Sequence, residues 1–82
     1  MFNAKVTVRL KKGLLDPQGT AISGALRSLG YSQVKEVKVG KFIEVSLNAK
    51  DKAEAGKKVE EMCRKLLANP VIEAYSYEIE EV

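Results

Sequence analysis

The sequence predicts an α+β fold: a two-layer sandwich in which two helices cover one face of a four-stranded antiparallel sheet, in the ferredoxin-like order β-α-β-β-α-β. Residues 4–10 and 71–82 alternate apolar and polar side chains, as half-buried strands do. Two stretches between them carry apolar residues at helical spacing, and residues 34–47 have the pattern of a hairpin. Right-handed crossovers would place the first and third strands in the middle of the sheet.

The first strand and the first helix are separated by a change in period. The stretch AKVTVRL at residues 4–10 alternates strictly, which predicts a strand with one buried face. Asp16 is then placed to cap a helix and Pro17 to start it, and Gly30 ends it in the left-handed conformation that C-terminal caps prefer. The apolar side of this helix would consist of Ile22, Ala25, Leu26 and Leu29.

The stretch VKEVKVGKFIEVSL at residues 34–47 predicts two strands that pair as a hairpin. Apolar residues alternate on both arms, and Gly40 lies where a tight turn needs a glycine. The last strand would follow at residues 71–82, with Tyr75, Tyr77 and Ile79 on one face.

A second helix is predicted between the hairpin and the last strand. Asp51 and Glu54 have the spacing of a capping box at its start, and Asn69 and Pro70 stop it. Cys63 falls in the apolar stripe of this helix, which predicts a small buried thiol.

The face of the sheet that the helices leave open is predicted to be polar, with one aromatic residue. Its members would be Lys5, Thr7, Arg9, Phe42, Glu44, Ser46, Glu78 and Glu80. A four-stranded sheet with two or three aromatics on its open face can stack RNA bases. A free-standing module for RNA or a small metabolite is therefore the alternative function, although Phe42 is the only aromatic offered. The basic residues of the first strand and the acidic residues of the last would attract each other if these strands pair.

Composition excludes most catalytic and metal-binding chemistry. The chain has no histidine and a single cysteine, so imidazole catalysis and thiolate metal sites have no residues to support them. Both aspartates, Asp16 and Asp51, lie where helix capping explains them. The glycines lack the spacing of a phosphate-binding loop. We therefore expect no catalytic, cofactor-binding or metal-binding residues in this chain.

Length and charge set further limits. With 82 residues the chain forms one domain, residues 1–82, and a domain of this size buries only about 60–65% of its unfolded surface, which favours self-association. The net charge of +3 comes from basic and acidic residues mixed along the chain, which argues against a nucleic-acid surface. No apolar run approaches the roughly 20 residues of a membrane span, and we expect a cytoplasmic protein.

The stretch KKGLLDPQG at residues 11–19 is unusually apolar and basic for a connection. Turn formation and capping account for its glycines, for Asp16 and for Pro17. They do not account for Leu14 and Leu15, or for the two lysines that precede them. The leucines either fold back over the first helix as a hydrophobic staple or contact another molecule.

Four stretches of this sequence resemble the PurS family, the small subunits of phosphoribosylformylglycinamidine synthase. They are KKGLLDPQG, LGY at residues 29–31, VGKFIEV at residues 39–45 and CRKLLANPVIEAY at residues 63–75. They occur in the same order and at matching separations, and the likeness covers nearly the whole chain. The DPQG start and the LANPVIE end are specific in combination.

The resemblance implies a non-catalytic subunit of a ligase complex in purine biosynthesis. A large synthetase subunit would use ATP and Mg to activate the amide of formylglycinamide ribonucleotide, and a glutaminase subunit would supply ammonia. This chain would join the two and bind no cofactor itself. Family members form dimers or tetramers, which agrees with the limited burial of a small domain.

The resemblance also implies that residues 11–19 dock a partner subunit. Leu14 and Leu15 would be presented to the partner, with Lys11 and Lys12 at the rim of the contact. The full set of expected partner-binding residues is Lys11, Lys12, Leu14, Leu15, Asp16, Pro17, Gln18, Gly40, Lys41, Asn69 and Pro70. Gly40, Lys41, Asn69 and Pro70 are the weaker members, because a tight turn and a helix stop also explain them.

Overall fold

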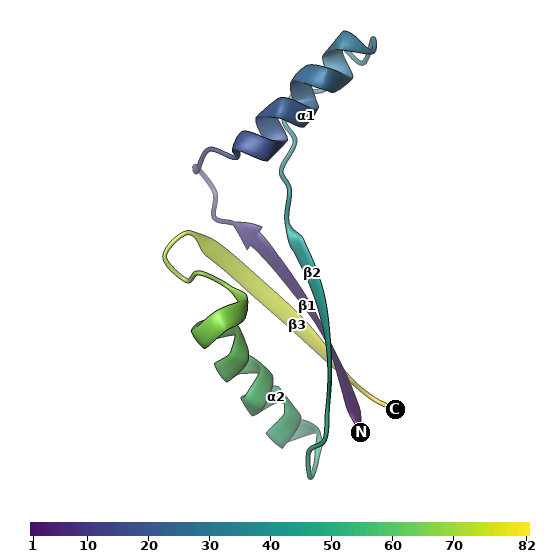
Figure 1. Cartoon of the computed structure of the whole chain (residues 1–82), viewed down its shortest axis with the longest axis vertical. Helices are drawn as coiled ribbons and strands as arrows, with labels where there is room; N and C mark the ends of the chain where they lie inside the picture. The colour runs from purple at the N-terminus through teal and green to yellow at the C-terminus, as the bar shows by residue number, and fades with distance from the viewer.

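The chain folds into an antiparallel sheet of three strands, one helix against the sheet and one helix beyond its end (Figure 1). The computed structural model describes residues 1–82. In chain order the elements are β1 (Phe2–Leu10), α1 (Pro17–Ser28), β2 (Lys41–Leu47), α2 (Lys52–Met62), the single π-helical turn η1 (Cys63–Leu67) and β3 (Glu73–Glu81). The sheet order is β2-β1-β3, so the α+β class is confirmed.

The central strand β1 forms the core because its alternation puts every second side chain under α2. Ala4, Val6 and Val8 are buried, and both neighbours are in register with them. Val6 lies opposite Ile43 of β2 on one side and Tyr77 of β3 on the other. The predicted central position of the first strand and its buried face are confirmed.

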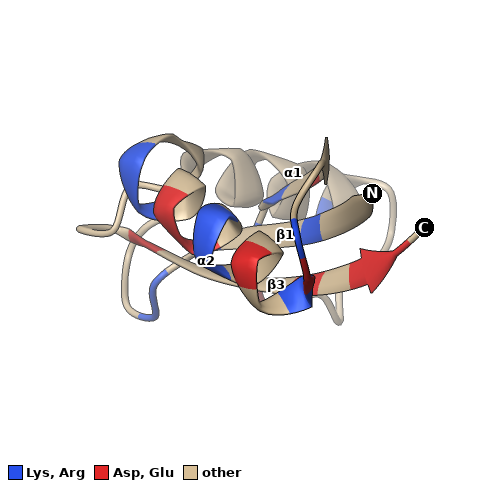
Figure 2. Ribbon diagram, turned by 90° about the horizontal axis from the view of Figure 1, so that it is seen from below, with Lys and Arg blue, Asp and Glu red and all other residues tan.

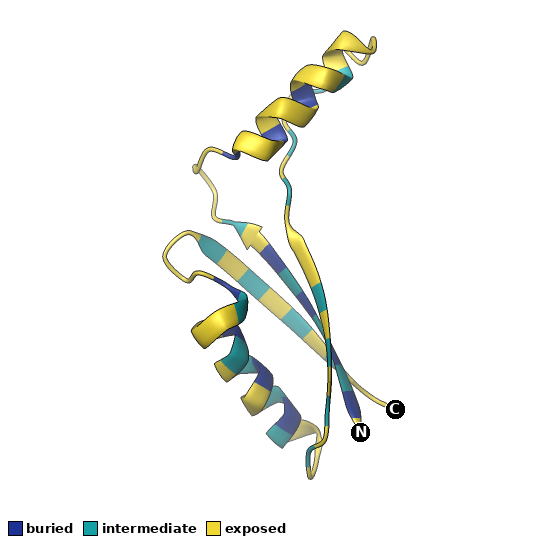
Figure 3. Cartoon of the chain, in the orientation of Figure 1, coloured by how far each residue is buried: buried dark blue, intermediate teal, exposed yellow.

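Helix α2 covers β1 and β3 through a stripe of small residues. Ala55 and Val59 of α2 and Cys63 at the start of η1 are fully buried, and Figure 3 shows buried residues along β1 and on this helix face. The Asp51 carboxylate caps the helix by accepting from the Glu54 N–H at 2.8 Å, as the sequence predicts. Glu60 of α2 joins the helix to β3, because its carboxylate accepts from the hydroxyls of Tyr75 and Tyr77.

The predicted hairpin at residues 34–47 is wrong, and with it the fourth strand. Only the second arm pairs, as β2, while residues 34–40 form an extended segment without a strand partner (Figure 1). The chain passes through Gly40 without turning back: Gly13 and Gly30 are the glycines with positive φ, and Gly40 is not among them. A glycine is needed at residue 40 for a different reason, because a Cβ there would lie 2.6 Å from the Val8 carbonyl oxygen.

The prediction that both helices cover the sheet is also wrong for α1. This helix lies beyond the end of the sheet, packed along the extended segment (Figure 1). We call α1 and the segment up to residue 39 the arm. The arm makes the chain 51 Å long, with a radius of gyration of 16.3 Å. A compact chain of this length would have about 12 Å.

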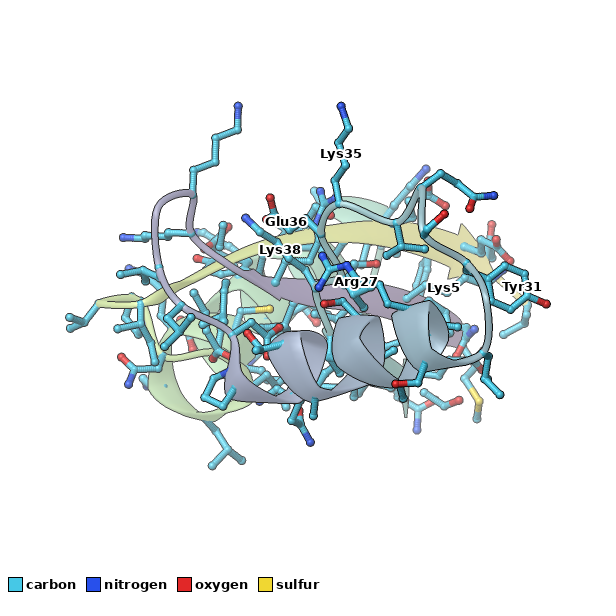
Figure 4. The ribbon with its side chains drawn as sticks, turned by 90° about the horizontal axis from the view of Figure 1, so that it is seen from above. Lys5, Arg27, Tyr31, Lys35, Glu36 and Lys38 are labelled. Atoms are coloured by element: carbon cyan, nitrogen blue, oxygen red, sulfur yellow. The ribbon has the colours of Figure 1, made fainter.

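The side chains of Asp16 and Arg27 join α1 to the extended segment through three hydrogen bonds. The Asp16 carboxylate accepts from the Gly19 N–H at 3.0 Å, which caps α1, and from the Val39 N–H at 2.7 Å. Arg27 donates to the carbonyl oxygens at positions 34 and 35 at 3.1 Å, so its side chain lies against the segment in Figure 4. Gly30 follows the helix with a φ of +104°, as predicted for a C-terminal cap.

Charged residues on the open face of the sheet pair as the sequence suggests. Lys5 of β1 lies 3.0 Å from the Glu80 carboxylate of β3, and both side chains are partly exposed. This interaction raises the pKa of Lys5. Figure 2 shows blue and red segments alternating along the sheet and α2 rather than separating into two fields. The pair adds little stability at the surface, but it favours the β1–β3 register.

We predict opposite effects for alanine at two glycines of α1. A Cβ at Gly19 would lie 1.8 Å from the Val37 carbonyl oxygen, so Gly19→Ala should force the helix off the extended segment and destabilise the chain by about 1–3 kcal/mol. Gly24 has no atom within 4 Å of such a Cβ, so Gly24→Ala should stabilise the helix by about 0.5–1 kcal/mol. Urea unfolding curves measure both. Equal stability of the two variants would show that the helix does not pack on the segment in solution.

A second prediction concerns the pH dependence of the arm. The hydrogen bonds from Val39 and Gly19 lower the pKa of Asp16. The resulting stability is present above about pH 4, the pKa of an unfolded aspartate, and is lost as the pH falls through the lower folded-state pKa. Asp16→Asn should therefore be less stable than the wild type at neutral pH, and the difference should shrink in acid. Unfolding curves at pH 7 and pH 3 measure this, and a constant difference would contradict it.

Candidate subunit-docking site

The loop between β1 and α1 is fixed at its start by Lys11. The Lys11 N–H donates to the Ile72 carbonyl oxygen at 2.9 Å, and its ammonium donates to the Pro70 carbonyl oxygen at 2.7 Å. Leu14 then donates to the Lys11 carbonyl oxygen at 3.4 Å, which closes a turn through Gly13 at a φ of +84°. The loop after β1 is therefore anchored to the loop before β3.

The two leucines of this loop are exposed. Leu15 has 79% of its surface accessible and Leu14 40%. A staple over α1 would bury a leucine against the helix, so the exposure of Leu15 favours the alternative, a contact with another molecule.

The loop before β3 is ordered by its own side chains. The Asn69 side-chain oxygen accepts from the Val71 N–H at 3.1 Å, and the Asn69 N–H donates to the Glu73 carboxylate at 2.7 Å. Pro70 lies between them and presents its carbonyl oxygen to Lys11. The structure thus brings Asn69 and Pro70 next to the loop at residues 11–15, although they are almost sixty positions apart in the chain.

A cavity of about 290 Å³ lies where the arm joins the sheet. The ammonium of Lys41 lies at its edge, 4.0 Å from the Glu73 carboxylate and 3.4 Å from the Leu67 carbonyl oxygen. The lining residues come from β1, the start of α1, the extended segment, β2 and β3: Leu10, Asp16, Pro17, Gln18, Val39, Gly40, Lys41 and Glu73. Five of the predicted partner-binding residues therefore line one cavity.

A second cavity of about 400 Å³ shares Leu10 with the first and is strongly basic. It is lined by Arg9, Leu10, Lys11, Lys12, Lys38 and Ala74. A concave surface with four cations attracts an acidic partner surface and speeds association with it.

Sequence reasoning missed three residues of this region. Glu73 orders the loop before β3 and neutralises Lys41, while Arg9 and Lys38 complete the basic cavity. In the sequence, Glu73 directly follows the stretch NPVI, which contains the predicted site residues Asn69 and Pro70, and this position could have marked it. Arg9 and Lys38 come from separate elements, and nothing local in the sequence marks them.

The cysteine and the tyrosines with raised pKa values lie against the core and not in these two cavities. Burial raises the pKa of Cys63, and the hydrogen bond to Glu60 raises that of Tyr75. No group of three or more histidine, cysteine, aspartate or glutamate side chains is arranged to hold a metal ion. None of the helices has the length and apolar character needed to cross a membrane.

The chain is similar over its whole length to known proteins of one kind. A family model for PurS, phosphoribosylformylglycinamidine (FGAM) synthase, matches residues 3–81. The PurS subunit of Bacillus subtilis is 49% identical over 82 residues, covering 100% of this chain and 96% of that protein. The PurS subunit of Methanocaldococcus jannaschii is 44% identical over 82 residues, covering 100% of this chain and 99% of that protein.

Solved structures agree with the sequence matches. A crystal structure of Bacillus subtilis PurS superposes with a TM-score of 0.89 at 48% identity, covering 99% of this chain and 100% of that one. A chain in the structure of PurLQS from Thermotoga maritima superposes with a TM-score of 0.86 at 32% identity, covering 96% of each chain. This chain therefore belongs to the PurS family of phosphoribosylformylglycinamidine synthase.

Proposed function

We propose that this chain is the small, non-catalytic subunit of phosphoribosylformylglycinamidine synthase, a ligase complex of purine biosynthesis. The observation that carries the proposal is the full-length likeness to PurS subunits, including one solved within the PurLQS complex. In this role the chain joins the synthetase subunit and the glutaminase subunit. Its place in this pathway is also the basis for assigning it to the cytoplasm.

The reaction is divided among the three subunits. The synthetase subunit binds ATP and Mg and activates the amide oxygen of formylglycinamide ribonucleotide, and the glutaminase subunit releases ammonia from glutamine. This chain contributes contacts and binds no cofactor. Its composition supports that division, because it lacks histidine and its one cysteine is buried.

The junction of arm and sheet is the surface that we assign to the partner subunit. It combines an exposed leucine at the tip of a well-anchored loop with a basic cavity beside it. Buried apolar anchors supply most of the affinity of an interface, and rim charges mainly set its specificity and association rate. Leu14 and Leu15 are the proposed anchors, with Lys11 and Lys12 at the rim.

The chain also associates with itself in this proposal, as a dimer or tetramer. Only 11 of its 82 residues are buried, and α1 lies beyond the end of its own sheet (Figure 1). A domain with so small a core gains stability by burying surface against a second copy.

Reconstitution of the complex tests the function. The synthetase and glutaminase subunits should convert formylglycinamide ribonucleotide with glutamine and ATP only when this chain is added, and the three should elute together from a sizing column. The isolated chain should hydrolyse neither ATP nor glutamine, because it carries no residues for either reaction. Full activity of the two large subunits without this chain would refute the proposal.

The docking loop makes a sharper prediction. Replacing Leu14 and Leu15 by serine should weaken binding to the synthetase subunit by about 2–4 kcal/mol, the usual loss for interface anchors. The melting temperature of the isolated chain should hardly change, because Leu15 has 79% of its surface exposed. Titration against the synthetase subunit and one thermal melt separate the two effects.

A matched control uses an exposed leucine outside the loop. Leu66 is 83% exposed on η1, so Leu66→Ser removes the same kind of surface without touching the proposed contact. It should bind as the wild type does. A double-serine variant that melts early but, when folded, binds with unchanged affinity would show that the loop has only a structural role.

A further inference from the structure

The open face of the sheet carries a row of side chains that changes from aromatic to basic. Thr7 and Arg9 alternate with the buried valines of β1, so both lie on the open face. Phe42 of β2 and Ser76 of β3 lie directly opposite Thr7, one on each side. Two residues further along β1, Arg9 lies opposite Ala74 of β3. The row therefore runs from an aromatic ring, past two hydroxyls, to a guanidinium.

Three cavities follow this row, and each shares residues with the next. The first has a volume of about 350 Å³ and is lined in part by Phe42. A small cavity of about 60 Å³ shares Thr7 and Ser76 with it. The small cavity in turn shares Arg9 and Ala74 with the basic cavity of about 400 Å³. Together they form one groove, which we call the open-face groove.

The basic end of the open-face groove has no carboxylate to neutralise it. Its four cations are Arg9, Lys11, Lys12 and Lys38, and none of the residues that line it is acidic. Arg9 and Lys12 form no ion pair within the chain, and Lys38 meets only Glu36, at 3.4 Å. Cations gathered in a concave surface produce a strong positive potential, so this end favours a multiply charged anion such as a diphosphate.

We propose that the open-face groove binds one nucleoside diphosphate, with its base stacked on Phe42 and its phosphates at the basic end. Phe42 has 62% of its surface exposed, and exposed aromatic rings on a sheet are platforms on which bases stack. Thr7 and Ser76 lie between the two ends, where their hydroxyls can bond to the sugar. Phe42 and Arg9 are separated by one strand spacing and two residues, about 8 Å, which suits the reach of a nucleotide from base to phosphate.

The open face favours a single nucleotide over a nucleic-acid strand. Sheets that bind a strand stack two or three bases and need an aromatic for each, whereas Phe42 is the only aromatic on this face. Beyond Phe42 the face is acidic, with Glu44, Glu78 and Glu80, which would repel the phosphates of a continuing strand. Glu78 lines the same cavity as Phe42, and its carboxylate can accept from the exocyclic amine of adenine.

The nucleotide would be bound and released unchanged, because the chain has no histidine and its one cysteine is buried. Binding is a property of the isolated chain and does not rest on the proposed function. The groove is built from side chains, which is why the absence of a glycine-rich phosphate loop in the sequence does not argue against it.

Calorimetric titration of the wild-type chain tests the site, with ADP as the ligand and adenosine and pyrophosphate as its two halves. ADP should bind once per chain. Adenosine and pyrophosphate should each bind at least roughly tenfold more weakly, because each occupies only one end of the groove. Equal affinities for pyrophosphate and ADP would show that the base makes no contact, and would overturn the proposal.

The base end is tested at Phe42. Phe42→Thr removes the ring but keeps a residue that suits a strand. It should weaken ADP binding by roughly tenfold, the usual loss for one stacked base, and leave pyrophosphate binding unchanged. Phe42→Tyr keeps a ring and should bind ADP as the wild type does. Tyr31→Thr is the matched control, because Tyr31 is 51% exposed but lies outside the groove. Unchanged ADP binding by Phe42→Thr would contradict the stacking.

The phosphate end is tested at two cations from different elements. Arg9→Gln combined with Lys38→Gln should weaken ADP and pyrophosphate binding equally, by roughly tenfold, because both ligands lose the same charged contacts. Lys57→Gln combined with Lys58→Gln removes the same charge from exposed positions of α2, on the other face of the sheet, and should have no effect. Equal losses in the two double variants would show that only net charge matters, and would overturn the site.

Two further measurements separate this inference from its alternatives. Single-stranded oligonucleotides that bind more tightly than ADP, and more tightly still as they lengthen, would replace the single nucleotide by a strand. Co-elution with the synthetase subunit is measured separately on Phe42→Thr, which leaves the docking loop intact. Nucleotide binding can therefore fail while the subunit role stands, and the subunit role can fail while the groove still binds ADP.

Discussion

The Asp16 carboxylate determines the shape of this subunit, because it binds two segments at once. One oxygen caps α1 through Gly19 and the other accepts from Val39, more than twenty positions later. A capping residue alone would orient only the helix. By also accepting from Val39, Asp16 joins the extended segment to α1 in one arm.

The arm leaves the chain with a small core and an incomplete sheet. The buried cluster is confined to β1, α2 and the residues beside them, and nothing of α1 contributes to it. Most of the stability of a single copy must therefore come from the three-stranded half, while the arm depends on Asp16, Arg27 and the close approach at Gly19. Surface that one copy cannot bury remains available to a second copy and to the larger subunits.

Local patterns in the sequence correctly predicted the features that depend on neighbouring residues. The alternation of β1, both aspartate caps and the buried Cys63 are confirmed. The hairpin failed because alternation reports which face of a strand is apolar, and does not report which strand lies beside it. Gly40 fitted a turn, but it equally fits the close approach to Val8. In the candidate site, Arg9 and Lys38 escaped notice because only the fold brings them together.

If residues 11–19 dock a partner subunit as proposed, their position would link self-association to assembly of the complex. The loop is anchored to the sheet through Lys11, and it runs into the arm at Asp16. The end of the loop that is next to Asp16 can therefore move only as much as the arm moves. Fixing the arm against a second copy would restrict the loop, and this would lower the conformational entropy lost in the proposed contact with the synthetase subunit. A subunit without catalytic groups can in this way strengthen a complex, because its contribution is the rigidity of the surfaces that it presents.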